Sequence, residues 1–327
     1  MKYANEKTVN AIYTKTSFND ENIFIEAMPE MLTKEEFFKN IEKFPAYVEN
    51  IKEMNPQQRR SLLSNIYKCF YPMEYMYYIY DTLYRAIIEN YSSKSTIDSI
   101  RQINALYHGR ENDIEYTTQS YSGAILGVPG IGKTSTIKRS LSVMPQVIIH
   151  TNYKGQPLFE KQITFLIIEC PSDCSVRTLA TSILIAIDKA IGSEYSSGIA
   201  GNSRESVIGR LIERVKIACL KHHVGVIIID EIQNAVATAS KTKQIKPLIK
   251  FLVELTNEAC VSTCFCGTLL AEELFQTQEH LKRRTRGMRL LPLRPDITYI
   301  NFLNKIWTYQ VTLKKTTLNE KIANIKN

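Results

Sequence analysis

The sequence predicts an α/β fold with a parallel five-stranded sheet, preceded by a helical region. Three observations predict it. A glycine-rich segment lies between an apolar strand and a helix, a β-branched apolar run ends in two acidic residues, and strand and helix patterns alternate from Ser122 onward. Because parallel strands need a crossover connection, usually a helix, this alternation indicates a single parallel sheet.

The glycine-rich segment GVPGIGKT fits the phosphate-binding pattern G-x-x-x-x-G-K-[ST]. It follows a buried strand, Ser122–Gly127, and precedes a helix, Ser135–Met144. Glycines let backbone N–H groups turn toward phosphates, and the helix N-terminus adds the positive end of its dipole. We expect Lys133 to reach the β- and γ-phosphates and Thr134 to ligate Mg²⁺. The expected ATP-binding residues are Gly127, Val128, Pro129, Gly130, Ile131, Gly132, Lys133, Thr134 and Ser135.

The acidic motif closes the run VGVIIIDEIQNA, Val224–Ala235. Apolar β-branched runs are typical of central parallel strands that are buried on both faces. Its acids fall at the carboxyl end of the strand, where open α/β sheets bind ligands. We expect Asp230 to hold the Mg²⁺ shell and Glu231 to orient the attacking water, so the pair predicts ATP hydrolysis as well as binding.

The remaining elements follow from periodicity and from proline and glycine positions. Tyrosines are frequent between Tyr67 and Ile88, and they form either a buried core element or a partner-binding face. The other predicted helices are Lys34–Ile51, Tyr67–Ile88, Val176–Gly192, Val207–His223, Ile245–Ala259 and Phe302–Leu313. The other predicted strands are Gln162–Cys170, Cys260–Thr268 and Met288–Leu293. These elements divide the chain into a helical adaptor region (1–113), an ATPase core (114–296) and a partial helical lid with a basic end (297–327).

Composition narrows the class of protein. The chain of 327 residues is 44% hydrophobic and 23% charged, as expected for a globular protein, and it has no apolar run that would span a bilayer. Its seven cysteines lack paired Cys-x-x-Cys spacing, which favours reduced thiols and a cytoplasmic location. Cys264 and Cys266 alternate along a predicted strand and are interpreted as core residues, not zinc ligands.

The net charge of +8 is concentrated at the C-terminal end. Residues 281–327 contain 11 basic and 2 acidic residues, whereas the rest of the chain is almost neutral. A basic surface on an ATPase suggests nucleic acid or another polyanion as partner. A solvated basic helix face is the alternative.

Four stretches carry a resemblance to a known family: Ser122–Leu141, Val147–Ser175, Ile227–Ala235 and Phe251–Thr268. They include the tetrad DEIQ and the run H-x-x-Y-x-G-x-P-L. Both patterns are more specific to one family than the phosphate-loop motif is. The chain resembles the AAA+ ATPases and, among them, TnsC and TniB, the ATP-dependent regulators of cut-and-paste DNA transposons, some of which are CRISPR-associated. The resemblance extends over about residues 100–315.

The resemblance implies further site residues. Thr268 would be a sensor that touches the γ-phosphate or the attacking water, and Arg283 or Arg284 would be an arginine finger for a neighbouring subunit's ATP. It also implies assembly into a ring or helical filament, of the hexameric or heptameric kind, on double-stranded DNA. The implied partners are a target selector of the TniQ or TnsD type and transposase subunits. The DNA-contacting candidates are Lys154, Lys161, Lys241, Lys243 and Lys246.

The sequence therefore predicts an ATP-dependent, DNA-binding regulator of transposition whose hydrolysis controls its assembly. Two alternatives remain open: an initiator or helicase-loader type of AAA+ ATPase, and a nucleotide-gated scaffold with negligible turnover. The chain stops at Asn327, soon after the first expected lid helix, so we expect a lid that is short or truncated. In the family that the chain resembles, the contact with the transposase lies in that region.

Overall fold

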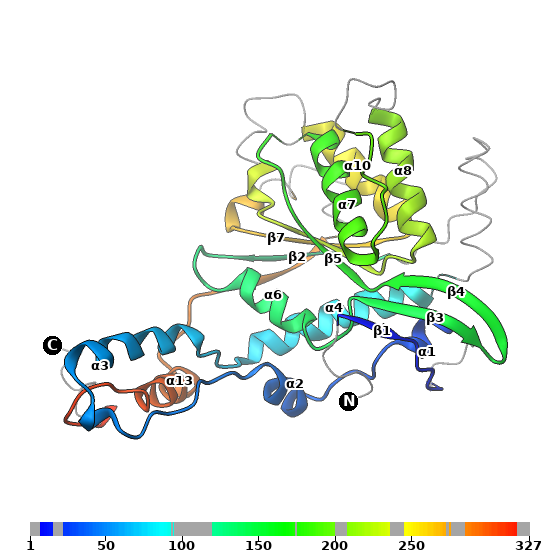
Figure 1. Cartoon of the computed structure of the whole chain (residues 1–327). Coiled ribbons are helices and arrows are strands. Elements are labelled where there is room, and N and C mark those ends of the chain that lie inside the picture. Colours follow the sequence, from blue (N-terminus) through cyan, green and yellow to red (C-terminus); the bar gives the residue numbers. More distant parts are fainter. Residues whose placement is uncertain are drawn as a thin grey trace. The chain divides into compact units, whose positions relative to one another are not determined.

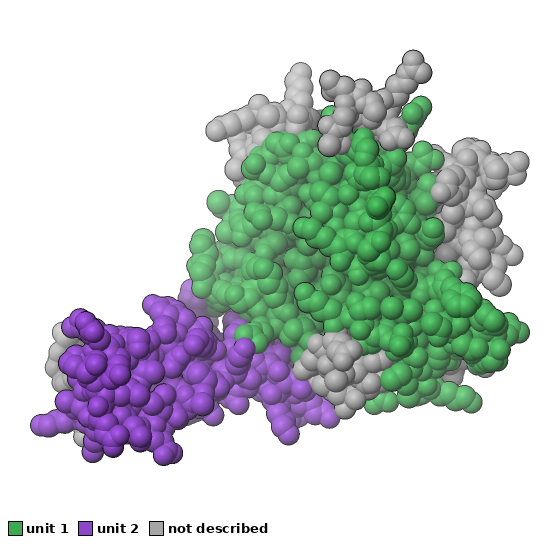
Figure 2. Space-filling view, viewed as in Figure 1, with its two compact units in different colours: residues 1–31, 78–291 green, residues 32–77, 292–327 purple. Residues whose placement is uncertain are grey.

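The computed structural model describes residues 7–15, 22–92, 94, 120–173, 175–199, 208–235, 245–272, 275 and 285–318. The chain forms two compact units (Figure 2). The larger consists of residues 1–31 and 78–291, and the smaller of residues 32–77 and 292–327. Each unit thus joins segments that lie far apart in the sequence, and the units divide the chain at other positions than the boundaries 1–113, 114–296 and 297–327. The functional division into adaptor, core and lid stays a prediction.

The larger unit contains the expected sheet of five strands, and all of its strand pairs are parallel. The strands are β2 (Ser122–Gly127), β5 (Phe165–Glu169), β6 (Val226–Asp230), β7 (Ser262–Gly267) and β8 (Thr285–Leu290). Their order is β5-β6-β7-β2-β8, so the strand before the glycine-rich segment lies between β7 and β8. The predicted fold class is confirmed. The last strand begins and ends three residues earlier than the predicted Met288–Leu293.

Helices cover both faces of this sheet (Figure 1). On one face lie α7 (Val176–Ile191), α8 (Ile208–Lys221) and α10 (Ile245–Glu258), and on the other lie α6 (Lys133–Leu141) and α4 (Glu74–Ser92). Helix α7 ends where Gly192 takes a left-handed conformation with φ 69°, which glycine adopts without strain. The five-stranded sheet is therefore buried on both faces, as its apolar strands predict.

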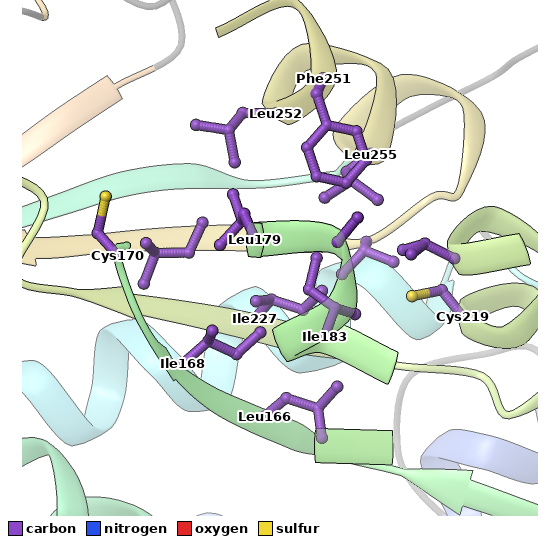
Figure 3. Packing of buried hydrophobic residues seen from close by; sticks show 14 of the residues in the cluster. Leu166, Ile168, Cys170, Leu179, Ile183, Cys219, Ile227, Phe251, Leu252 and Leu255 are labelled. Atoms are coloured by element: carbon purple, nitrogen blue, oxygen red, sulfur yellow. The ribbon is translucent and has the colours of Figure 1, made fainter. Parts of the chain in front are cut away.

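The core between the sheet and helices α7, α8 and α10 is built mainly from aliphatic side chains, with Phe251, Cys170 and Cys219 among them (Figure 3). Leu179 and Ile183 of α7 are fully buried, and so is Ile227 of β6. Burying an aliphatic side chain of this size contributes roughly 1.5–3 kcal/mol relative to leaving it exposed. This packing fixes the position of β6 in the sheet and therefore the position of Asp230, the last residue of this strand.

A second sheet, which the sequence did not predict, has the order β1-β3-β4. Strands β3 (Val147–Tyr153) and β4 (Gln156–Ile163) form an antiparallel hairpin, and β1 (Thr8–Asn10) pairs with β3 in parallel. The hairpin turns at Lys154 and Gly155, which have φ 50° and φ 82°. The predicted strand Gln162–Cys170 is wrong as one element, because it comprises the end of β4 and then β5.

Helix α4 begins at Glu74 because Pro72 precedes it, so the predicted helical start at Tyr67 is wrong. Its tyrosines divide between two environments. Tyr80 is 2% exposed, which confirms the core interpretation for that residue, whereas Tyr78 is 54% exposed. The Tyr91 hydroxyl donates a hydrogen bond to the carbonyl of Ile163, 3.1 Å away, and so connects the end of α4 to the end of β4.

The smaller unit combines α2 (Lys34–Ile41), α3 (Pro56–Leu62) and α13 (Ile297–Trp307) with short 3₁₀ segments, Ile51–Glu53 and Leu63–Lys68. In the larger unit, a short helix, α1 (Ile23–Ala27), and the 3₁₀ turn Leu269–Ala271 complete the described elements. Helix α2 stops at Ile41 rather than Ile51, since Lys43 pairs instead with Phe70 in an antiparallel bridge. Helix α13 starts earlier than predicted, at the N-cap Asp296.

The two segments of the smaller unit are joined by specific contacts. The Tyr309 hydroxyl donates to the carbonyl of Pro45 at 2.8 Å, and the Tyr309 ring stacks on Phe44 with centroids 6.0 Å apart. The Lys305 ammonium lies 3.8 Å from a carboxylate oxygen of Glu42. Residues in and just after the helix predicted as part of a lid therefore contact residues of the segment 32–77.

Three buried histidines, His150 on β3 and His222 and His223 between α8 and β6, make the stability of the fold depend on pH. Burial lowers the pKa of His222 to about 4, and it also lowers the pKa of His150 and His223. The unfolded chain therefore binds more protons as pH falls below the ordinary histidine range, and the free energy of unfolding falls with it. For His222 alone the loss between neutral pH and about pH 5 is roughly 2 kcal/mol.

Urea unfolding at both pH values measures this loss. The variant His222→Gln keeps a polar group of similar size without the titration, and we expect its unfolding free energy to depend less steeply on pH. An equal dependence in the variant and the wild type would contradict the role of His222.

Candidate nucleotide site

The glycine-rich segment forms a tight loop between β2 and α6. Gly130 and Gly132 have φ 80° and φ 90°, a left-handed conformation that favours glycine. At Gly127 the constraint is space, since a Cβ there would lie 2.9 Å from the Cβ and the carbonyl oxygen of Leu290 on β8. The predicted roles of these glycines as backbone-shaping residues fit this geometry. The loop leads directly into the first turn of α6, which starts at Lys133.

The Lys133 side chain folds back into this loop. It is 8% exposed, and its ammonium donates hydrogen bonds to the carbonyls of Gly127 and Val128, each at 3.0 Å. An ammonium carries three N–H donors, so this position allows a further bond to an anion above the loop. The charge is therefore held at the mouth of the helix dipole, where phosphate binds most favourably.

The side chain of Thr134, on α6, contacts the side chain of Asp230, at the carboxyl end of β6. The Thr134 hydroxyl donates to one carboxylate oxygen of Asp230 at 2.6 Å, and the backbone N–H of Glu231 donates to the other at 2.9 Å. The buried Cys266 thiol lies against the same carboxylate; burial and the charge of Asp230 raise its pKa. The structure thus brings together the two side chains predicted to hold Mg²⁺. A hydroxyl and a carboxylate are the oxygen ligands that Mg²⁺ prefers.

Glu231 and Thr268 lie at the ends of neighbouring strands β6 and β7. Glu231 has φ 57°, a left-handed conformation that is uncommon for a residue with a side chain. Its carboxylate accepts a hydrogen bond from the Gln233 side-chain amide, and the same amide's oxygen accepts from the backbone N–H of Thr268 at 3.0 Å. The Thr268 hydroxyl oxygen is buried without a hydrogen-bond partner among the described residues.

These observations show whether the residues of the site suit ATP and Mg²⁺. The loop provides left-handed glycines and a helix N-terminus for phosphates, Lys133 provides a cation, and Thr134 with Asp230 provides metal ligands. The unsatisfied Thr268 hydroxyl provides a polar group that a ligand would satisfy, and an unpaired buried hydroxyl otherwise costs about 1–3 kcal/mol. The residues present therefore fit a nucleotide with its metal.

Several predicted residues lie elsewhere. Lys246 is exposed on the first turn of α10, and Lys154 occupies the turn of the β3–β4 hairpin. The Lys161 ammonium donates to the carbonyl of Ile191 at 2.9 Å, so it already has a structural role at the C-terminal end of α7. Arg283, Arg284, Lys241 and Lys243 lie outside the described residues, and their predicted roles stay predictions.

Sequence reasoning placed Gln233, Asn234 and Cys266 outside the site, and it interpreted Cys266 as a core residue. Gln233 belongs to the DEIQ tetrad, which carried the resemblance, so a signal for it existed in the sequence. Asn234 donates from its side chain to the carbonyl of Cys170 at 3.0 Å and so links the turn after β6 to β5.

Within the described residues, no helix is long and apolar enough to cross a membrane.

The comparison with protein-family models agrees with this geometry. Residues 116–275 match the family model described as "AAA domain", and this segment contains both motifs. None of the curated proteins compared with the chain matches it. Three solved structures share parts of its fold at low identity, and each chain is longer than the region it shares.

The first of these structures is the ORC1 protein of Aeropyrum pernix in complex with DNA, with 15% identity and a TM-score of 0.38 over 64% of this chain and 48% of that one. The second is a Walker-type ATPase of Pyrococcus abyssi, with 14% identity and a TM-score of 0.41 over 69% and 61%. The third is Drosophila ORC bound to GC-rich DNA and Cdc6, with 10% identity and a TM-score of 0.36 over 71% and 34%. The chain thus spans about half the length of the first. Residues 116–275, just under half of the chain, are thus similar to an AAA domain, and the site that they contain has the residues of a P-loop nucleotide site.

Proposed function

We propose that the protein hydrolyses ATP with Mg²⁺ and that it does so as an assembly on double-stranded DNA. The observation that carries the ATPase part is the pairing of Thr134 with Asp230 at 2.6 Å, with Glu231 next in the chain. This arrangement puts metal ligands and a second carboxylate at one end of the sheet, beside a phosphate-binding loop. A site for binding alone would not need the second carboxylate.

Each residue then has one task. The loop amides and Lys133 bind the β- and γ-phosphates, and Thr134 and Asp230 hold the metal, which neutralises charge on the phosphate oxygens when it is bound. Glu231 orients a water molecule and accepts its proton as the water attacks the γ-phosphorus; the bond from the γ-phosphorus to the oxygen of the β-phosphate breaks, and ADP leaves with that oxygen. The Thr268 hydroxyl donates to the γ-phosphate or to that water.

An incomplete site is the reason to propose an oligomer. The side chains that we assign to the phosphates include one cation, Lys133, whereas phosphoryl transfer develops charge on several oxygens. We propose that Arg283 or Arg284 supplies a second cation to the ATP of a neighbouring subunit. The resemblance to TnsC and TniB supports this assignment. It also supports the wider role, in which the assembly links a TniQ- or TnsD-type target selector to the transposase. ATP hydrolysis would then limit the extent of the assembly.

The DNA part of the proposal rests on charge. The excess of basic residues after residue 281 and the lysines Lys241, Lys243 and Lys246 would contact the phosphate backbone without reading base sequence. We expect affinity for duplex DNA to be insensitive to sequence and to fall steeply with salt. Replacing the three lysines by alanine should reduce the slope of log affinity against log salt by up to about 0.9 for each phosphate that is no longer neutralised.

Fluorescence anisotropy with labelled duplex DNA over a salt series measures this slope. The matched control replaces three exposed lysines of the smaller unit, Lys39, Lys52 and Lys68, and so removes the same charge. The proposal expects the control to keep the wild-type slope. If both triple variants lose slope equally, general charge and not this segment governs binding.

For the target selector we propose a docking surface within the residues that precede β2. Deleting residues 1–113 would remove β1 and α4, which contribute buried residues to the larger unit. A deletion would therefore unfold the ATPase domain as well as remove the docking surface. Substitutions of exposed side chains in the segment 32–77 avoid this problem.

A further inference from the structure

The turn after β6 contains a glutamine whose side chain contacts groups on two strands. We propose that Gln233 is a positioning residue for ATP hydrolysis: its amide fixes the carboxylate of Glu231 and couples it to Thr268. The inference rests on the proposed function, because Glu231 is there the group that orients water. It assigns Gln233 a role that the phosphate loop and the acid pair do not contain.

The orientation of the amide follows from chemistry. The backbone N–H of Thr268 can only donate, so the group facing it at 3.0 Å must be the amide oxygen of Gln233. The amide nitrogen then faces Glu231, whose carboxylate can only accept when ionised. Both ends of the amide are therefore specified, and neither a carboxylate nor an apolar group at position 233 would satisfy both partners.

The surroundings are shaped to hold this amide. A Cβ at residue 267 would lie 2.5 Å from the Gln233 amide oxygen and 2.8 Å from Cγ2 of Ile232, so Gly267 leaves the space that the glutamine occupies. On the other side of the turn, Asn234 donates to the carbonyl of Cys170 at 3.0 Å. The turn is thus attached to the end of β7 by one side chain and to the end of β5 by the next.

This attachment explains how Glu231 keeps its backbone conformation. A left-handed conformation is unfavourable for a residue with a side chain and persists where the surroundings determine it. The left-handed backbone at φ 57° turns the chain out of the direction of β6. The amide of Gln233 then restricts the rotation of the carboxylate. A fixed carboxylate orients water better than a freely rotating one, so the loss of Gln233 should act on turnover and not on nucleotide affinity.

The coupling to Thr268 adds a consequence. Thr268 contributes a backbone N–H to Gln233 and a buried hydroxyl that has no partner among the described residues. A γ-phosphate bound at that hydroxyl would set the position of Thr268. The single amide of Gln233 would then transmit that position to Glu231, so the carboxylate would be aligned when ATP, and not ADP, is bound.

The test compares Gln233→Met, which keeps the side-chain length without the amide, with Gln233→Asn, which keeps the amide but cannot span both partners. The matched control is Gln156→Met, the same exchange at an exposed position of β4. We expect both Gln233 variants to lower kcat on the order of 10-fold, with KM, ADP affinity and Tm close to wild type. The control should equal the wild type in all four quantities.

A double-mutant cycle separates positioning from general structure. In the Glu231→Gln background, single-turnover rates should not fall further on Gln233→Met, because the carboxylate to be positioned is already gone. Additive losses would overturn the inference, and so would a kcat for both Gln233 variants equal to that of the wild type. A common loss of Tm and ADP affinity in both variants would make Gln233 a structural residue and would also overturn it. If the wild type itself does not hydrolyse ATP, the proposed function fails first and this inference fails with it.

Discussion

Replacing Lys133 by alanine is expected to weaken nucleotide binding on the order of 100-fold. The ammonium lies inside the phosphate-binding loop, 3.0 Å from two of its carbonyls, and is 8% exposed. Removing one partner of a buried charge pair typically costs about 2–5 kcal/mol, because the phosphate charge loses its compensation. Titration with a fluorescent ADP analogue measures the affinity directly.

Lys138→Ala is the matched control, since Lys138 is an exposed lysine on the same helix, α6. We expect it to bind nucleotide as the wild type does. Equal affinities for the Lys133 and Lys138 variants would show that the ammonium of Lys133 does not contact the phosphates. The loop would then have to be assigned another ligand.

Replacing Glu231 by glutamine is expected to lower ATP hydrolysis by at least about 100-fold, since a positioned acid or base contributes about that much or more. Nucleotide binding should persist because Lys133, Thr134 and Asp230 are unchanged. If the protein assembles on DNA in its ATP state, the variant should stay assembled longer than the wild type. Phosphate release measures the first effect, and dissociation from duplex DNA after dilution measures the second.

Glu213→Gln on α8 is the control for this exchange, because Glu213 is an exposed carboxylate outside the site. It should hydrolyse ATP at the wild-type rate. A Glu231→Gln protein that hydrolyses as fast as this control would remove Glu231 from the mechanism, and a nearby carboxylate would have to replace it.

The parts of the site that could be predicted are those whose partners are fixed by chain direction. Parallel strands place their carboxyl ends at the same edge, so a glycine-rich loop after β2 and an acid after β6 were expected near each other, and Thr134 lies 2.6 Å from Asp230. The strand Ser122–Gly127 also matches its predicted bounds, because the composition of the sequence changes at both of its ends. A run buried on both faces is apolar throughout, and its ends are marked by the change in composition.

Other features depend on contacts that no local pattern records. Strand β1 is three residues long and exists because it pairs with β3, about 140 residues later in the chain. Gln233 has its role only because Gly267, on another strand, leaves room for its amide. In the smaller unit, Tyr309 stacks on Phe44, so a segment predicted as a lid contacts the N-terminal region.

The measurement that tests the central claim most directly is steady-state phosphate release by the purified chain with ATP, Mg²⁺ and duplex DNA. The account predicts turnover that disappears when Mg²⁺ is chelated and falls on the order of 100-fold in Glu231→Gln, while the variant still binds ATP. Binding of ATP by both proteins with equal, negligible phosphate release would contradict it. The site would then belong to a nucleotide-gated scaffold and not to an ATPase.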